Sequence, residues 1–240
     1  MRPRCNKPVT LFSPGGRLLQ VEYAQNGVQK GSTAVGIRCY NCVVLALEQK
    51  ELMPQQMEHT TERIFSLDKN MIMSYAGISP DARVLVARAR AKCQKLRALN
   101  DEDPVSVRLI TEYLANLKLK YTQAPDCRPF GVSCLIGGYD ANVKARLYQT
   151  DPYGNYSEYI ATAIGRSAQT ALAYLEKGYA TSFLPSRHRA IKLAIGALLS
   201  VSHPERREFE VVLLKRNNQL VKLEQDVIAE YVANMDEYMG

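Results

Sequence analysis

The sequence predicts an α+β protein in which two antiparallel sheets pack together and carry helices on both outer faces. Three observations predict this arrangement. Strand-like segments come in hairpin blocks rather than alternating singly with helices, which disfavours a parallel, doubly wound sheet. Pairs of amphipathic helices separate these blocks. No interdomain linker is visible, so residues 1–240 are expected to form one domain.

The first expected element is a helix over residues 17–30, which follows a polar tail. Its apolar residues Leu18, Val21 and Val28 share one side, the spacing of an amphipathic helix. Gly31 ends it, as glycine often does at a helix C-terminus.

Two strand hairpins are expected next, because apolar runs flank two short turns. The four strands span residues 32–37, 42–48, 63–68 and 71–77.

Two helices then follow, with Pro at or near the start of each. Ser79 and Pro80 mark the first, over residues 79–100, as N-cap and first helical residue. Asp103 and Pro104 open the second in the same way. Apolar residues recur along the second helix at Val105, Leu109, Tyr113 and Leu117.

The C-terminal half repeats the order of strands and then helices. In its first strand, alternate residues share a face, namely Phe130, Val132, Cys134 and Ile136. The expected strands span residues 130–140, 146–152, 156–165 and 209–216, and the expected helices span 167–179, 185–202 and 225–239.

The composition is that of an ordinary soluble globular protein, with 46% hydrophobic and 23% charged residues. No apolar run has the length of a membrane span, and the N-terminus lacks the hydrophobic centre of a signal peptide. We therefore expect a protein of the cytoplasm and nucleus that does not contact a membrane. The six cysteines fit reduced thiols. Cys39 and Cys42 form a CxxC between two strands, where a turn with two small side chains is favoured over a zinc or redox motif.

The net charge of +7 raises the possibility of nucleic-acid binding. The basic residues, however, are scattered through helical segments and do not interleave with aromatic residues. A solvated face, or one that meets an acidic protein neighbour, is the favoured interpretation. The three histidines have no metal-binding spacing, and no cofactor motif is present, so neither metal nor cofactor is expected.

One candidate nucleophile remains, in the segment Gly31–Ser32–Thr33. An N-terminal nucleophile uses its own free α-amine as the base, so the preceding chain has to be removed. Here a helix-like segment lies immediately upstream, and cleavage after Gly31 would expose Ser32 rather than a threonine. The favoured interpretation is a pair of hydroxyl residues that enter a core strand.

The segment "FSPGGRLLQVEYAQNGVQKGSTAVGIR" closely resembles the N-terminal signature of eukaryotic 20S proteasome alpha subunits. The motifs "YAGISPDARVL", "RPFGVSCLIGGYD" and "RLYQTDPYGNY" resemble the same family, and matches continue to about Leu223. The combination is most similar to the alpha type-7 class.

This resemblance implies the N-terminal nucleophile hydrolase fold, a four-layer αββα sandwich. It also implies a non-catalytic place in a hetero-heptameric alpha ring stacked on the catalytic beta ring, in ubiquitin-dependent protein degradation. Other alpha subunits, beta-ring subunits and the C-termini of regulatory-particle or other activators are the implied partners. Residues 1–16 would form the gate tail and turn, residues 17–30 a helix that fills the cleft left open in beta subunits, and residues 31–240 the sandwich.

The resemblance also assigns gate residues, some of which depart from the family pattern. A turn proline and a helix tyrosine match as Pro14 and Tyr23. The family's Tyr-Asp-Arg aligns with Cys5, Asn6 and Lys7, so the phenol, the carboxylate and the guanidinium are replaced together. We therefore expect an altered open-gate cluster.

Glycines replace other residues nearby, which predicts a weaker helix. Gly15 stands where the family turn has an aspartate. Gly27 stands where an alanine is common, at a cost of about 1 kcal/mol of helix propensity.

The family's activator pocket aligns with Gly31, Arg63 and Gly77. A family lysine pairs there with the activator's C-terminal carboxylate, and Arg63 retains its charge. Two alternatives stay open on the sequence alone, a catalytic threonine-hydrolase-like subunit of the same fold and a basic nucleic-acid-binding protein.

Overall fold

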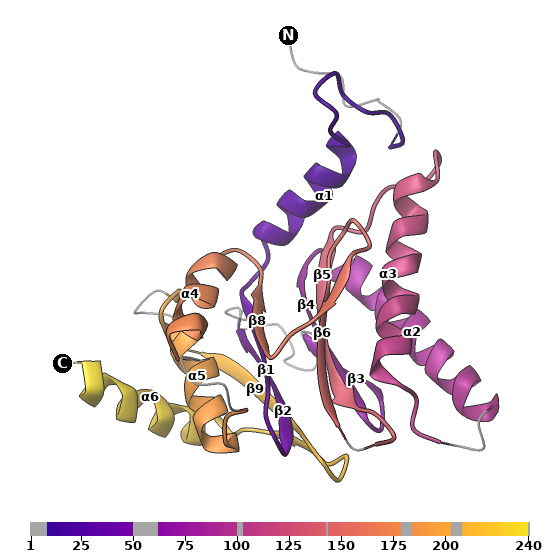
Figure 1. The fold of residues 1–240 in the computed structure, drawn as a ribbon. Coiled ribbons are helices and arrows are strands. Elements are labelled where there is room, and N and C mark those ends of the chain that lie inside the picture. Colours follow the sequence, from indigo (N-terminus) through magenta and orange to yellow (C-terminus); the bar gives the residue numbers. More distant parts are fainter. Residues whose placement is uncertain are drawn as a thin grey trace, which may run out of the picture.

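Two five-stranded antiparallel sheets form the centre of the protein, seen in a computed structural model (Figure 1). The structure describes residues 9–49, 62–99, 103–142, 144–178, 184–202 and 208–239. The first sheet has the order β10-β9-β2-β1-β8 and the second the order β3-β4-β5-β6-β7. The first sheet consists of β1 (Ala34–Arg38), β2 (Cys42–Glu48), β8 (Ala161–Ile164), β9 (Phe209–Lys215) and β10 (Leu220–Lys222). The second consists of β3 (Ile64–Asp68), β4 (Met71–Gly77), β5 (Val132–Tyr139), β6 (Ala145–Thr150) and β7 (Tyr156–Glu158).

Helices cover the two outer faces, as the order of elements predicts. In Figure 1, α4 (Ala168–Gly178), α5 (Arg187–Leu199) and α6 (Gln225–Met239) lie beside the first sheet. On the opposite side, α2 (Ser79–Leu99) and α3 (Val107–Gln123) cover the second sheet. The remaining helix, α1 (Leu19–Gln29), stands at one end of the sandwich.

Three hydrophobic clusters fill the spaces between these layers. One joins the first sheet to α4, α5 and α6, and another joins the second sheet to α2 and α3. The third lies between the sheets and includes Leu45, Leu135, Leu147 and Val28 of α1. Because alternate residues of a strand face opposite sides, each central strand contributes to two of these clusters. The predicted four-layer αββα arrangement is confirmed.

Both predicted N-terminal hairpins are present. β1 and β2 pair from Ala34 opposite Leu47 to Arg38 opposite Val43. β3 and β4 pair around the expected turn at Lys69 and Asn70. The predicted face of β5 is also confirmed, since Phe130, Val132, Cys134 and Ile136 all lie in the cluster under α2 and α3.

The start of α3 differs from the prediction. The helix begins at Val107 rather than at Asp103 and Pro104. Its first turn is stabilised by Asp140, whose carboxylate Oδ1 accepts hydrogen bonds from Val107 N at 3.0 Å and from Ser106 Oγ at 3.2 Å. A capping group 33 residues away in the chain leaves no local signal.

The predicted apolar side of α3 is confirmed in part. Val105 is buried, and Tyr113 and Leu117 pack against the core under α2 and α3, but Leu109 is 43% exposed. The fully buried side chains of the helix include Ile110, Leu114 and Lys118. The Nζ atom of Lys118 donates hydrogen bonds to Val132 O at 2.9 Å and to Thr150 Oγ1 at 2.7 Å. A lysine on the buried face interrupts the apolar periodicity there, so the sequence pattern does not mark the centre of that face.

The strand expected over residues 156–165 is divided between the sheets. β7 pairs with β6 in the second sheet, and β8 pairs with β1 in the first. Between them, Tyr159 N donates to Leu147 O at 2.9 Å and Ile160 O accepts from Arg38 N at 2.7 Å. The chain therefore crosses from one sheet to the other here. The short strand β10 was not predicted either.

Candidate functional site

The candidate nucleophile segment enters the first sheet as part of the interior. Thr33 is 1% exposed, and Ser32 is also buried. The main-chain O of Thr33 accepts from Glu48 N at 3.1 Å, and its Oγ1 accepts from Ser167 N at 3.4 Å. Arg166 N donates to Gly31 O at 3.0 Å. In the unprocessed chain the nitrogen of Thr33 belongs to a peptide bond, and only removal of residues 1–32 would give it the free amine that an N-terminal nucleophile uses as its base.

Helix α1 leads directly into this segment and is anchored at its C-terminal end. Val21 and Val28 are buried, and Val28 belongs to the cluster between the sheets. A methyl group on Gly31 would lie 2.4 Å from Gly77 N. Gly77 has φ +121° and approaches Gly131 O, which accepts a hydrogen bond from Ile78 N at 3.0 Å. The predicted pocket residues Gly31 and Gly77 are therefore in direct backbone contact.

The turn before α1 is closed by Ser13. Ser13 N donates to Arg17 O at 2.8 Å, and Ser13 Oγ accepts from Arg17 N at 3.1 Å. Pro14 and Gly15 are exposed in this turn, and Tyr23 on α1 is 47% exposed. The residue before α1, Leu18, makes no side-chain cap hydrogen bond. The expected gate residues Cys5, Asn6 and Lys7 lie outside the described residues.

The third predicted pocket residue, Arg63, points into the protein. It is 9% exposed, and its guanidinium carbon lies 5.4 Å from the centre of the Tyr75 ring. Arg63 Nη1 donates to Glu48 O at 3.4 Å. The Glu48 carboxylate in turn forms an ion pair with Arg166 Nη2 at 3.4 Å. Glu48 thereby links Arg63 to the loop that holds Gly31 and Thr33.

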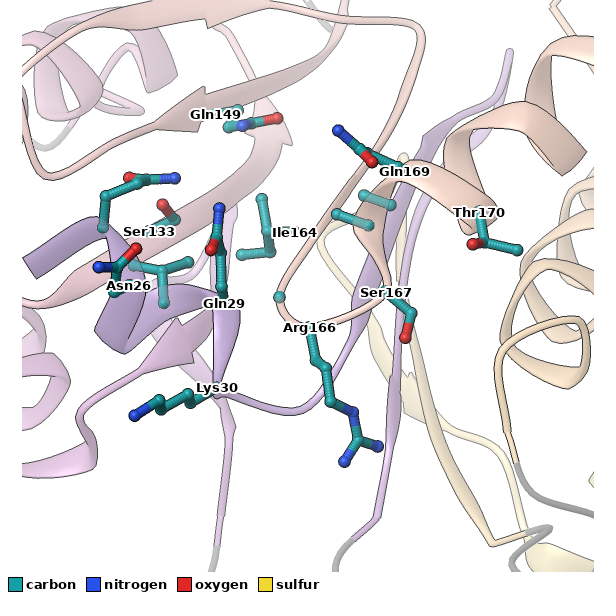
Figure 2. A pocket seen from close by; sticks show the side chains of 15 residues that line it. Asn26, Gln29, Lys30, Ser133, Gln149, Ile164, Arg166, Ser167, Gln169 and Thr170 are labelled. Carbon is teal, nitrogen blue, oxygen red and sulfur yellow. The ribbon is translucent and has the colours of Figure 1, made fainter. Parts of the chain in front are cut away.

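A polar pocket of about 830 Å³ opens between α1 and the start of α4. Figure 2 shows Asn26, Gln29 and Lys30 of the α1 segment on one side and Arg166, Ser167 and Gln169 on the other. Ser133 of β5 and Gln149 of β6 also line it. The lining consists mainly of amides and hydroxyls, with Lys30 and Arg166 as its cations, so it suits an anionic or strongly hydrogen-bonding ligand.

Sequence reasoning missed this pocket, although two local signals border it. Lys30 precedes the helix-ending Gly31, and "RSAQT" spans the start of α4. Neither signal indicates that the two segments meet. No group of three or more His, Cys, Asp or Glu side chains suited to a metal occurs among the described residues. In the same part of the chain, no helix is long and apolar enough to cross a membrane.

Comparisons with known proteins match nearly the whole chain. The family described as "Proteasome subunit" matches residues 28–214, and the N-terminal signature of the proteasome alpha-type subunits matches residues 8–26. The chain belongs to the proteasome alpha-subunit family. Alpha-type subunits form the non-catalytic ring of the 20S core particle, a threonine protease complex, and this chain is one of them.

Similar alpha subunits come from insects and mammals. The proteasome alpha type-7-1 subunit of Drosophila melanogaster is 47% identical over 97% of this chain and 93% of the relative. The alpha type-7-like subunit of Macaca fascicularis is 46% identical over 99% and 94%. The alpha-type 8 subunit of Homo sapiens is 45% identical over 99% and 94%. The expected likeness to the type-7 class is confirmed, and it extends to type-8.

Proposed function

We propose that this chain forms part of the alpha ring as a gating and docking subunit that keeps residues 1–31 in the mature particle and hydrolyses no peptide itself. The observation that carries this proposal is the covalent and packed continuity of α1 with β1. Removing the segment up to Gly31 would take Val28 out of the core between the sheets and break the Gly31–Gly77 contact. Cleavage that gives Ser32 or Thr33 a free amine would therefore remove packing that stabilises the sandwich.

Its proposed partners follow from ring membership. Other alpha subunits would flank it in a hetero-heptameric ring, and subunits of the stacked beta ring would contact it. The net charge of +7 suits an acidic neighbour better than nucleic acid, because the basic residues are scattered through helical segments and the sequence has no stacking pattern of aromatic residues among them. We place the assembled particle in the cytoplasm and nucleus.

The gating role assigns the tail before Pro14 to closing the substrate entrance. Core particles assembled with a chain that lacks residues 2–12 should hydrolyse a small fluorogenic peptide faster than particles with the full chain, without any activator. Native gel electrophoresis would check that equal amounts of particle assemble. An unchanged rate in normally assembled particles would refute the gating role.

Activator docking is the second part of the proposal. The pocket beside α1 offers Lys30 and Arg166 to an anionic C-terminus, and Arg63 joins the same region through Glu48. Arg63 does not line this pocket and is 9% exposed, so its charge would act through the positions of Glu48 and Arg166.

Peptide hydrolysis stimulated by an activator's C-terminal peptide tests this docking. Arg63→Ala and Lys30→Ala should each reduce the stimulation, because Lys30 lines the pocket and Arg63 holds Glu48, the ion-pair partner of Arg166. Arg88→Ala removes an exposed charge from α2, which lies in the helical layer opposite α4. This control variant should leave the stimulation unchanged. Full stimulation of particles with Arg63→Ala would rule out the assigned role of that residue.

A further inference from the structure

Cys39 and Cys42 face one another at the end of the β1–β2 hairpin. The last strand pair joins Arg38 to Val43, and beyond it Cys39 N donates to Cys42 O at 2.8 Å. Only Tyr40 and Asn41 connect the two cysteines. An opposed antiparallel pair that exchanges both backbone hydrogen bonds has Cα atoms about 5.5 Å apart, and Cys39 and Cys42 make one of these two bonds. This separation lies within the range of about 4.4–6.8 Å that a disulfide spans.

Both side chains also point to the same face of the hairpin. Cys39 and Cys42 belong to the cluster under α4, α5 and α6, and both are free thiols. The two side chains therefore lie on the same side of the hairpin, at its closed end.

The two thiols differ in their electrostatic surroundings. The neighbouring Cys39 thiol, as a hydrogen-bond donor, lowers the pKa of Cys42, burial opposes this effect, and the positive charge of Arg187 at the start of α5 adds to the lowering. The same hydrogen bond and burial raise the pKa of Cys39. Since the thiolate is the nucleophile in thiol chemistry, Cys42 is the attacking group and Cys39 the resolving group.

We propose that Cys39 and Cys42 form a reversible dithiol–disulfide pair that a hydroperoxide oxidises. The Cys42 thiolate attacks one oxygen of the hydroperoxide, the O–O bond breaks, and the released alkoxide or hydroxide takes up the proton lost by Cys42. The resulting sulfenic acid is attacked by the Cys39 sulfur, an S–S bond forms, and the leaving hydroxide takes the Cys39 proton. Two thiols and one hydroperoxide thus give one disulfide, one alcohol or water, and one water.

Because the pair is buried next to an exposed turn, we expect its oxidation to be slow and its disulfide to be readily reduced. Tyr40, at the tip between the cysteines, is 71% exposed, so solvent lies one side chain away from the buried sulfur atoms. Local opening of this tip would set the rate of oxidation. The disulfide closes only a four-residue loop, so it constrains the unfolded chain little and remains easy to reduce.

Mass spectrometry of the purified full chain tests the proposal. The chain is treated with hydrogen peroxide, its free thiols are alkylated after denaturation, and trypsin then cuts after Arg38 and Lys50 to place both cysteines in one peptide. The expected peptide carries no alkyl group and is two hydrogens lighter than the dithiol form. Dithiothreitol added before alkylation should restore the doubly alkylated peptide.

Variants and internal controls separate this pair from general oxidation. Cys93→Ser removes a lone buried cysteine of α2 and should leave the disulfide yield unchanged. With glutathione disulfide as the probe, Cys39→Ser should accumulate glutathione on Cys42, whereas Cys42→Ser should not accumulate it on Cys39. The proposal fails if the peptide stays doubly alkylated while the partly exposed Cys127 is oxidised, or if its cysteines reach only irreversible oxidation states. This readout on the unaltered chain does not depend on the folding of any variant.

Discussion

At the scale of single residues, Asp81 connects α2 to the loop before β5, and through Gly131 and Gly77 to the residue that follows α1. Its carboxylate accepts two hydrogen bonds from Arg128, each at 2.6 Å, and one from Gly131 N at 3.0 Å. Gly131 lies against Gly77, which contacts Gly31. Burial raises the pKa of Asp81, but the hydrogen bonds from Arg128 and Gly131 outweigh it, so the pKa lies below its ordinary value.

Asp81→Asn should lower the free energy of unfolding by about 1–2 kcal/mol at pH 7, because an amide cannot replace a carboxylate that accepts charge-assisted bonds. The value is modest because the Arg128 side chain is 65% exposed. A depressed carboxyl pKa stabilises the fold above the unfolded-state pKa of about 3.9, and this stabilisation is lost as pH falls through the folded-state pKa. Urea denaturation at several pH values should show the wild type and variant converging in acid. A constant difference down to low pH would argue against this assignment.

At the scale of elements, α1 contains one glycine and is followed by another, and the two have opposite structural roles. A methyl group on Gly27 would make ordinary contacts at 3.8 Å with Ile78 and 3.9 Å with Gly131 O. A methyl group on Gly31 would collide with the Gly77 backbone at 2.4 Å. The first glycine weakens the helix without a packing need, and the second makes the junction with β1 possible.

Gly27→Ala should therefore stabilise α1 by about 0.5–1 kcal/mol, and Gly31→Ala should loosen its attachment. Hydrogen exchange of the α1 amides measures both effects. Slower exchange is expected for Gly27→Ala and faster exchange for Gly31→Ala. If the two variants exchange alike, the Gly31–Gly77 contact does not anchor the helix.

Elements with local signals were predictable, and those determined by distant partners were not. The hairpins of β1–β2 and β3–β4 follow from apolar runs around short turns. The start of α3 depends on Asp140, and its buried face depends on the partners that Lys118 finds in β5 and β6. The break between β7 and β8 depends on Leu147 O and Arg38 N, which lie in different sheets.

At the scale of the whole molecule, the layered fold was predictable from the order of strand blocks and helix pairs. Gly31 and Gly77 were expected only as pocket residues, through the family resemblance, and their backbone contact was not expected. The polar pocket was not expected, because its walls come from α1, β5, β6 and the β8–α4 connection. Such a site exists only once the two sheets are packed.

The proposed function depends above all on α1 staying attached to β1, so that Thr33 never acquires a free amine. Mass determination of this chain from purified core particles, combined with labelling by a covalent inhibitor of N-terminal threonine nucleophiles, tests this attachment. We expect a mature N-terminus at Met1 or its processed neighbour and no label on this chain, while catalytic beta subunits in the same particles are labelled. A mature chain that begins at Ser32 or Thr33, or one that takes up the inhibitor, would overturn the non-catalytic role proposed for it.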